Sequence, residues 1–407
     1  MGVVKLVVEL KPHHPVYVPG QVLKGEVSMV VMNSVTCREI RVNVFGGGYV
    51  MWKRGSGKRT ITYISREYFM NLGVKVWQSS GIYTYPFTFR FANPLPSSVE
   101  GMHGYVRYEV KAVVDRVRAF NTTTSLPFTV NSIVDLNSLI SVSRKPIRKE
   151  ADQTTCCLFC TSGPIHLTLE AARTGYVPGE EIVVYGQVAN HSNSVIKYSE
   201  LSLVQQLTYH CKKRSKVELQ TLHREYRPEV RPGGRQDWSG VKILVPPVPP
   251  SYLPWCQIID IKHYLVLSAK LGLCRNVMLS AEVLIGNVPL PNTLEEEGVV
   301  GGGGGGRQVG SVIIPRPDLC PAPLTWQVVM GVGGDEEIDP HRLQEPARVM
   351  PRYTYGCYST YKSSSKSSSQ AAPVRMMLKR NSGNKSYSPR YITYNTSNYS
   401  HGDVTFA

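Results

Sequence analysis

The stretch GYVRYEVKAVVD, residues 104–115, alternates apolar and polar side chains along most of its length. Val106, Tyr108 and Val110 share one side of this pattern, and charged residues occupy the positions between them. Successive side chains of a β-strand point to opposite faces, so one face is expected on a core and the other in water. The stretch therefore predicts a half-buried strand of a β-sheet.

Segments of the same period recur from the N-terminus to about residue 290. Phe87, Phe89 and Phe91 alternate with polar residues, and comparable runs begin at Ile165 and Ile258. Pro-Gly and multiple-glycine turns separate the runs, and no helix longer than two turns is predicted. Many short strands punctuated by turns are typical of an all-β protein built from immunoglobulin-like sandwiches.

An internal repeat indicates two sandwiches of one design. The sequence Tyr-Val-Pro-Gly occurs at residues 17–20 and again at residues 176–179. In each copy proline presets φ and glycine supplies the positive φ of a type II turn. The spacing is that of a domain, so we expect sandwiches over residues 1–134 and 164–290, joined by a connector over residues 135–163.

The composition changes after residue 290. Six glycines at 301–306 form a spacer, a serine-rich tract covers 363–369, and eight tyrosines fall between Tyr353 and Tyr399. Apolar side chains are too sparse there to offset the entropy of ordering. Residues 291–407 are therefore predicted to be a disordered Gly/Ser/Tyr-rich tail.

Composition and charge narrow the class of protein. No apolar run approaches the roughly 18 residues of a membrane-spanning helix, no secretory signal is recognisable, and nine cysteines suggest free thiols in a reducing compartment. The net charge is +16, and residues 1–134 hold 16 basic against 7 acidic residues. An anionic partner and ordinary solubilising charge both explain this excess. A cytoplasmic protein is expected.

Motifs for catalysis are missing from the sequence. It has no H-E-x-x-H or G-x-S-x-G pattern, and Gly57-Lys58 lacks the first glycine and the Ser/Thr of a P-loop. His13 and His14 are adjacent and point apart in an extended chain, which disfavours a shared metal. No nucleophile–base pair can be named, so neither an enzyme nor a cofactor is expected.

One cysteine cluster leaves three interpretations open. Cys157 and Cys160 have the spacing of zinc ligands, and the adjacent Cys156 could be a third. A fourth ligand would have to come from elsewhere. A packed, reduced connector and lipid-modified thiols are the alternatives.

Pro249-Pro250-Ser251-Tyr252 matches P-P-x-Y, the motif bound by WW domains. Two prolines favour polyproline II, which lies on aromatic grooves, and tyrosine fills the next pocket. The motif stands between two predicted strands, where a rigid crossover of the sandwich explains the same prolines.

A basic hairpin is predicted between strands near Tyr49–Met51 and Ile61–Tyr63. The cations Lys53, Arg54, Lys58 and Arg59 gather at its tip. Phosphorylated segments or anionic lipid are candidate ligands, since each cation near an anionic membrane contributes about 1 kcal/mol. A solvated hairpin is the alternative.

Over about residues 3–290 the sequence resembles the α-arrestins, the arrestin domain-containing proteins. The resemblance rests on several long motifs in the right order. They are Phe87-Thr88-Phe89, Asn93–Gly101, Gly104–Ala112, Cys156–Ile165, Gly175–Glu180, Trp238–Gly240, Pro246–Ser251 and Ile285–Leu290.

The resemblance implies two arrestin-type sandwiches and no enzymatic activity. It also implies an adaptor, peripheral at the plasma membrane and endosomes, that binds membrane receptors or transporters and promotes their ubiquitination, endocytosis and sorting. By its order in the chain, the basic hairpin resembles the central loop that arrestins insert towards receptors. Family members recruit HECT-type ubiquitin ligases through P-P-x-Y motifs in the tail. Here residues 291–407 contain none, and the sites ending at Tyr353 and Tyr391 have one proline each.

Two other functions are alternatives to the adaptor. A scaffold of an endosomal sorting coat would use the same fold. A basic nucleic-acid-binding protein would explain the pI of about 9.4, but the sequence has no recognition helix, zinc finger or ribonucleoprotein motif. No nucleic-acid partner is therefore expected.

Overall fold

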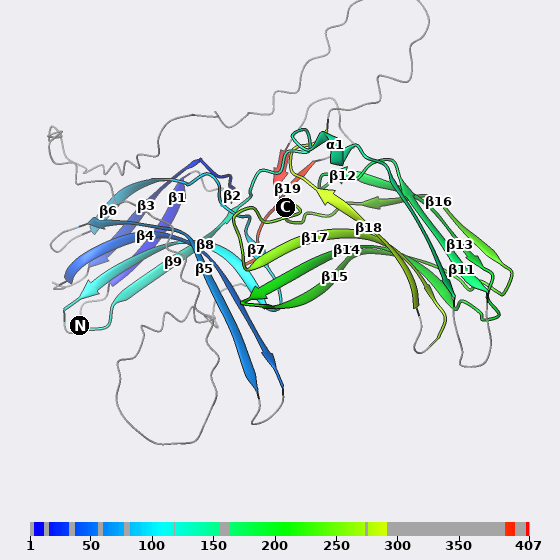
Figure 1. Cartoon of the computed structure of the whole chain (residues 1–407). Helices are drawn as coiled ribbons and strands as arrows, with labels where there is room; N and C mark the ends of the chain where they lie inside the picture. Colours follow the sequence, from blue (N-terminus) through cyan, green and yellow to red (C-terminus); the bar gives the residue numbers. More distant parts are fainter. Residues whose placement is uncertain are drawn as a thin grey trace, which may run out of the picture.

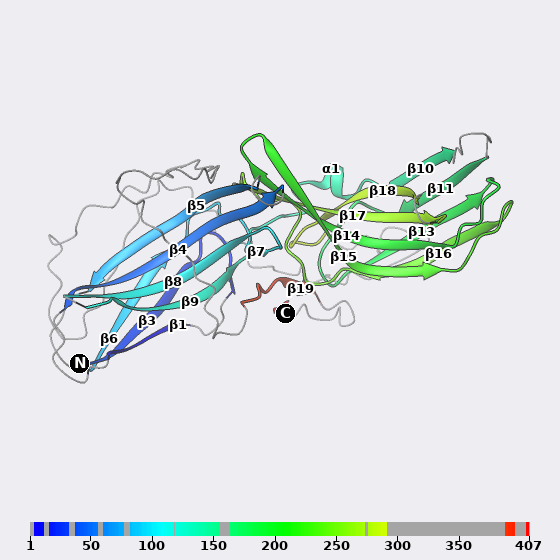
Figure 2. The same ribbon diagram turned by 90° about the horizontal axis from the view of Figure 1, so that it is seen from below.

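Two β-sandwiches lie end to end in the computed structural model, and the chain between them runs through a narrow junction (Figures 1 and 2). The structure describes residues 4–11, 16–31, 37–55, 60–76, 82–117, 119–154, 163–272, 276–290, 387–394 and 404–406.

The first sandwich pairs a small sheet with a large one. The small sheet has the order β1 (Val4–Lys11), β3 (Val22–Val31), β6 (Ile82–Arg90). The large sheet has the order β2 (Val16–Tyr17), β9 (Thr122–Val130), β8 (Gly104–Arg116), β4 (Cys37–Arg54), β5 (Ile61–Val76), and β7 (Val99–Glu100) pairs with β8. Strand β8 has the predicted alternation, because Val106, Tyr108 and Val110 are fully buried. The sequence prediction for this strand is confirmed.

The second sandwich repeats the plan with four and five strands. One sheet has the order β10 (Ile147–Thr154), β11 (Pro164–Ala171), β13 (Glu181–Asn190), β16 (Arg235–Leu244). The other has the order β12 (Gly175–Tyr176), β18 (Asn276–Ile285), β17 (Ile259–Lys270), β14 (Tyr198–Cys211), β15 (Arg214–Arg227). Among the described residues the helix α1 (Ile140–Ser143) is the only one, so the all-β prediction holds.

Each sandwich encloses an apolar core. In the first, Tyr17, Phe91 and Phe128 pack ring against ring with centroids 5.4–5.5 Å apart. In the second, the largest buried side chain is Trp238, which is 1% exposed. Burial of one such side chain stabilises the fold by roughly 1.5–3 kcal/mol, so the cores supply most of the driving force.

The two Tyr-Val-Pro-Gly segments occupy equivalent places in the two sandwiches. Gly20 and Gly179 have φ of 83° and 94°, as the predicted type II turns require. The turns close identically, since the residue after each glycine donates its N–H to the carbonyl three residues earlier. Each turn follows a two-residue strand, β2 or β12, that runs parallel to a longer strand of its sheet. The sequence repeat thus reflects a structural repeat.

The segment predicted as a connector joins the second sandwich. Strand β10 pairs along its whole length with β11 and forms the edge of the four-stranded sheet. Ile147 is its only buried side chain. The sequence of β10 therefore has almost no apolar face from which a strand could be predicted. A small cluster of Leu136, Val177, Leu284 and Leu290 fastens the junction to the same sandwich.

Part of the predicted tail has a defined place. Residues 387–394 run beside the junction of the two sandwiches, and their strand β19 (Ile392–Tyr394) pairs with β20 (Val404–Phe406) (Figures 1 and 2). The expectation of disorder does not hold for this short segment. Residues 291–386, with the glycine spacer and the serine-rich tract, lie outside the described residues.

Candidate functional sites

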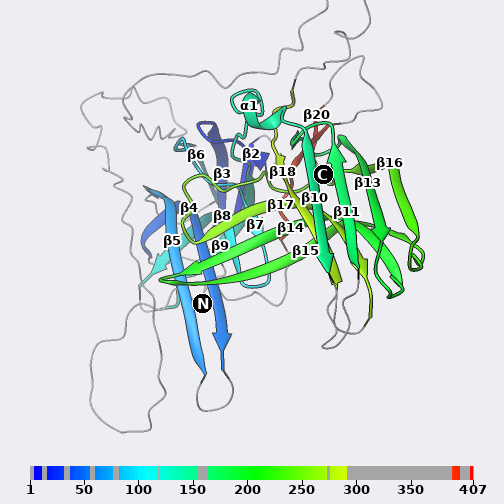
Figure 3. The same ribbon diagram turned by 45° about the vertical axis from the view of Figure 1, so that its right-hand side comes forward.

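The β4–β5 hairpin projects from the first sandwich (Figures 1 and 3). The pairing of β4 with β8 ends at Val50, whereas the pairing with β5 continues to Arg54 opposite Ile61. The last residues of β4 therefore form a two-stranded ribbon beyond the edge of the sheet. This geometry places the last described residues of β4 away from the body of the domain.

Two features stabilise the hairpin at its base. Trp52, 6% exposed, stacks on Tyr63 across the strands with centroids 5.2 Å apart. A register shift at Gly46 and Gly47 accommodates Tyr108, because a Cβ on Gly46 would lie 2.4 Å from that ring. Bulges of this kind increase local twist and bend a strand, which helps the ribbon leave the plane of the sheet.

The structure describes half of the predicted basic cluster. Lys53 and Arg54 are exposed at the end of β4, as a ligand-binding tip requires. Lys58 and Arg59 lie outside the described residues. The fold thus brings two of the four predicted cations to the projecting end of the hairpin.

Side chains of the second sandwich complete the junction with the first. The Tyr209 hydroxyl donates to the Glu218 carboxylate over 2.5 Å, and the Met102 amide of the first sandwich donates to the same carboxylate over 2.9 Å. The ring of Tyr209 packs edge-on against His103 at 5.6 Å between centroids. Burial raises the pKa of Tyr209, so its hydroxyl stays a donor.

A second junction contact is built around Glu67 of β5. Its carboxylate accepts a hydrogen bond of 2.9 Å from the Gln257 amide, and the Cys211 thiol donates to the Ile64 carbonyl nearby over 3.4 Å. Burial raises the pKa of Glu67 and raises that of the neighbouring Cys256 to about 12. The protonated thiol of Cys256 is a poor nucleophile, so this cysteine serves packing.

The P-P-x-Y match lies in the crossover between β16 and β17. Pro249 and Pro250 are buried, and Ser251 is 1% exposed. Tyr252 has a φ of 64°, in the left-handed region, whereas a polyproline II ligand needs φ near −75°. The structure therefore holds this segment in a conformation that differs from a WW ligand.

Hydrogen bonds fix the same crossover to the sandwich. The Ser251 amide donates to the Ile285 carbonyl over 2.7 Å, and the Ser251 hydroxyl lies 2.9 Å from Nδ1 of the buried His263. The Tyr252 hydroxyl donates to the Glu282 carboxylate over 2.7 Å. The motif is thus a structural element of the second sandwich.

The cysteine cluster cannot be placed. Cys156, Cys157 and Cys160 lie outside the described residues, so the zinc, lipid and packing interpretations stay open. Within the described ranges no group of three His, Cys, Asp or Glu side chains has a geometry that could hold a metal ion.

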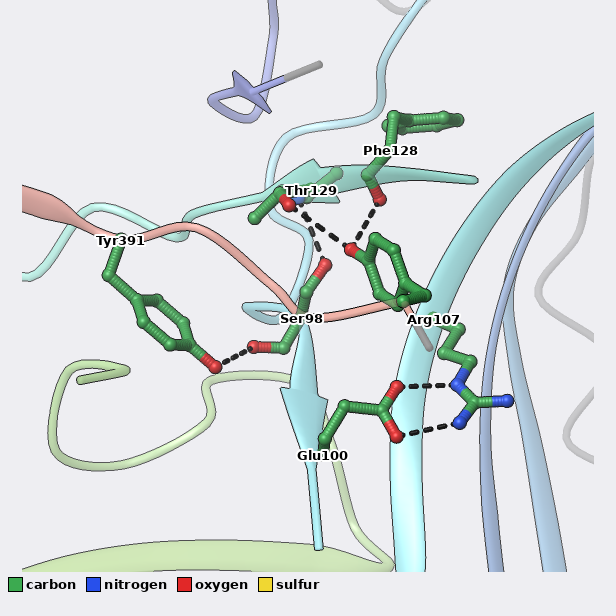
Figure 4. A network of polar contacts seen from close by, with 8 residues as sticks. Ser98, Glu100, Arg107, Phe128, Thr129 and Tyr391 are labelled. Carbon is green, nitrogen blue, oxygen red and sulfur yellow. Dashed lines mark hydrogen bonds and ion pairs between the residues drawn. The ribbon is translucent and has the colours of Figure 1, made fainter. Parts of the chain in front are cut away.

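The returning tail segment makes a polar site that sequence reasoning missed (Figure 4). The Tyr387 hydroxyl donates to the Phe128 carbonyl over 2.9 Å, and the Tyr391 hydroxyl donates to the Ser98 carbonyl over 3.1 Å. Between them, the Arg390 amide donates to the Thr129 hydroxyl near the end of β9, and the Arg390 carbonyl accepts from the Asn131 side chain just after β9. We call residues 387–391 the docked segment.

The only sequence signal for this site was indirect. Ser388-Pro389-Arg390-Tyr391 has a single proline and is an incomplete P-P-x-Y. Its tyrosines resemble the other tyrosines of the tail, because the acceptors that bind them belong to residues 259 and 293 positions earlier. Contacts between residues so far apart in the chain leave no periodic pattern in the local sequence.

No helix in the described ranges has the length and apolar character needed to cross a membrane.

The architecture is that of a two-domain arrestin-type protein. The family model described as "Arrestin (or S-antigen), N-terminal domain" matches residues 6–137, and the corresponding C-terminal domain model matches residues 161–290. Together they cover more than half of the chain, and the C-terminal model begins after β10, the edge strand of the second sandwich. The chain belongs to the arrestin family, and within it to the α-arrestins.

Curated relatives support the same assignment. The chain is 24% identical over 290 residues to arrestin domain-containing protein 4 of Homo sapiens, covering 67% of this chain and 68% of the relative. It is 27% identical over 334 residues to arrestin domain-containing protein 17 of Caenorhabditis elegans, covering 76% of each. It is 25% identical over 283 residues to thioredoxin-interacting protein of Sus scrofa, covering 67% and 71%. The chain is therefore an arrestin-type adaptor in general terms.

Proposed function

We propose that this protein is a non-enzymatic cytoplasmic adaptor that binds membrane receptors or transporters and directs their endocytosis and sorting. It acts at the inner surface of the plasma membrane and on endosomes. Arrestin-family proteins bind membrane proteins and other partners, and the chain shares their two-domain plan.

The projecting hairpin carries this proposal. Its ribbon extends beyond the sheet (Figure 3). The described part of β4 ends in the exposed cations Lys53 and Arg54. A basic tip on a protruding element reaches an anionic lipid surface or a phosphorylated receptor tail without hindrance from the domains. Exposed Met51, beside these cations, adds an apolar group to the same tip.

Ubiquitin-dependent sorting enters the proposal through a partner. The tail lacks a P-P-x-Y, and the complete motif is built into the second sandwich. We therefore propose that a HECT-type ligase is recruited by another protein or by a second α-arrestin. In this arrangement this chain binds the cargo, and the partner binds the ligase.

The hairpin test replaces Lys53, Arg54, Lys58 and Arg59 together by serine in the full-length protein. Affinity is measured against vesicles containing anionic lipid and against phosphorylated receptor-tail peptides, at several salt concentrations. Each cation near an anionic surface contributes about 1 kcal/mol, so we expect a fall of at least tenfold and a flatter dependence on salt.

A matched variant separates the hairpin from net charge. It replaces four exposed cations of the second sandwich by serine: Arg148, Lys149, Arg231 and Arg235. The change in net charge is the same, and we expect a fall smaller than threefold. Equal losses in both variants, or no loss in the hairpin variant, would contradict the proposal.

A further inference from the structure

The docked segment is held mainly through hydroxyl groups that donate protons to the first sandwich. Tyr387 donates to the Phe128 carbonyl, and Tyr391 donates to the Ser98 carbonyl (Figure 4). The Thr129 hydroxyl pairs with Tyr387 over 3.1 Å and accepts the Arg390 N–H over 3.2 Å. A hydrogen bond of 3.2 Å from the Asn131 side-chain amide to the Arg390 carbonyl completes the site.

With the segment docked, the base of the site is buried. Ser98 is fully buried, Thr129 is 2% exposed and Asn131 is 1% exposed. Ser98 is fixed by two hydrogen bonds with Val130, one through its amide and one through its hydroxyl. Rigid carbonyls that face a tyrosine select a group with a proton to donate, because they offer only acceptors.

A phosphorylated tyrosine lacks that proton. At neutral pH the phosphate ester carries about −1.5 to −2 charges and exposes acceptor oxygens. These oxygens would face the carbonyl oxygen of Phe128 or Ser98, and the two negative ends would repel each other. Arg107, whose charge acts on Tyr387, is already engaged, since it binds both oxygens of Glu100 and lies 3.9 Å above the ring of Tyr105. Binding a phosphate there would break an existing ion pair.

We propose that Tyr387 and Tyr391 are phosphorylation sites, and that phosphorylation of either residue releases the docked segment from the first sandwich. A tyrosine kinase acts on the segment while it is released. The phenolic oxygen forms a bond to the γ-phosphorus of ATP, the bond from that phosphorus to ADP breaks, and the hydroxyl proton passes to a base of the kinase. The phosphate then prevents the segment from docking again. This inference is independent of the proposed adaptor function.

The test uses cleavage of the full-length protein by trypsin after Arg390. That side chain is exposed, but its backbone is bound on both sides, so cleavage requires the segment to leave its site. Phosphotyrosine is incorporated genetically at position 391, at position 387, or at the tail position 361 as a control. Cleavage after Arg380 in the same samples corrects for protease activity.

We expect phosphotyrosine at 387 or 391 to accelerate cleavage after Arg390 by about tenfold or more, since each removes at least one partly buried hydrogen bond. Phosphotyrosine at 361 should leave the rate unchanged. Thr129→Val, which removes the hydroxyl shared by Tyr387 and Arg390, should accelerate cleavage without any phosphate.

Three results would overturn the inference. The first is cleavage after Arg390 in the unmodified protein as fast as after Arg380. The second is an unchanged rate with phosphotyrosine at both 387 and 391. The third is equal acceleration by phosphotyrosine at 361, which would indicate a general effect of tail charge. Hydrogen exchange at the Arg390 amide in the same proteins provides an independent reading of docking.

Discussion

The buried histidine beneath the P-P-x-Y crossover shows how one residue can make stability depend on pH. His263 is fully buried, Nδ1 lies 2.9 Å from the Ser251 hydroxyl, and Nε2 has no hydrogen-bond partner among the residues that the structure describes. Burial lowers the pKa of His263 to about 3. The folded state therefore holds a neutral imidazole, whereas the unfolded chain takes up a proton near pH 6.5.

The direction of the pH effect follows from these two values. Because the folded pKa is the lower one, the stabilising contribution of His263 is complete above about pH 6.5 and falls as the pH drops towards 3. We predict that between pH 7 and pH 5 it reduces the free energy of unfolding by about 2 kcal/mol. Urea unfolding of the full-length protein at both pH values, followed by tryptophan fluorescence, measures this loss.

His263→Gln is the matched control, because an amide can still bond to Ser251 but does not titrate. Its unfolding free energy should change with pH by about 2 kcal/mol less than that of the natural protein. The other histidines are common to both proteins and cancel in the comparison. Identical pH dependence would show that water reaches His263 and that its pKa is ordinary.

At the residue scale, the sequence predicted conformations better than contacts. The positive φ of Gly20 and Gly179 followed from the Tyr-Val-Pro-Gly repeat, because the turn type depends on neighbouring residues alone. The roles of Tyr387 and His263 depend on residues distant in the chain or on burial. No local pattern encodes them.

At the scale of the element, the crossover that contains the P-P-x-Y motif is part of the folded sandwich, and this affects its binding to WW domains. We predict weak direct binding of WW domains to the full-length protein. Pro249 and Pro250 are buried, and Tyr252 has a φ of 64°. The crossover must first open, and an opening cost of about 3 kcal/mol lowers the apparent affinity roughly a hundredfold.

A titration of WW domains against three samples measures this effect. They are the full-length protein, its Tyr252→Ala variant, and a synthetic peptide of residues 246–255 that contains the motif free of the fold. We expect the peptide to bind at least tenfold more tightly than the full-length protein, and Tyr252→Ala to change little. Low-micromolar binding to the full-length protein that disappears with Tyr252→Ala would mean that the crossover opens readily.

Element prediction succeeded where one face of a strand is strictly apolar. Strand β8 alternates along residues 104–112 and was predicted with its correct face inward. Strand β10 was assigned to a connector, because its pairing with β11 uses backbone groups and only Ile147 is buried. The β4–β5 hairpin was predicted, but its projection was not, because that depends on where β8 ends.

At the scale of the whole molecule, the relation of the two sandwiches depends on a few tightly packed contacts. The sequence predicted two domains, yet gave no information on their contact surface. The core of the first sandwich continues into Leu207, Tyr209 and Ile258 of the second. Leu207 and Tyr209 alternate with less buried residues of β14 like any other buried strand residues, so nothing marks them as belonging to a junction.

Gly101 is the position at which this junction can be tested. A Cβ there would lie 1.9 Å from the Tyr209 hydroxyl oxygen and 2.8 Å from Cδ1 of Leu207. The tyrosine cannot move freely, because Glu218 binds its hydroxyl together with the Met102 amide. Gly101→Ala must therefore shift the second sandwich or break this pair of hydrogen bonds.

We predict that Gly101→Ala loosens the junction at a cost of about 1–3 kcal/mol, as is typical of overpacking, while both sandwiches stay folded. Small-angle scattering should give a larger radius of gyration, and hydrogen exchange should accelerate at Met102 but not in the core strands β8 and β17. The matched control is Gly272→Ala, since a Cβ at Gly272 meets no atom within 4 Å. A scattering profile of Gly101→Ala identical to that of the control, with unchanged exchange at Met102, would show that the junction absorbs the methyl group and that the relative position of the domains does not depend on this contact.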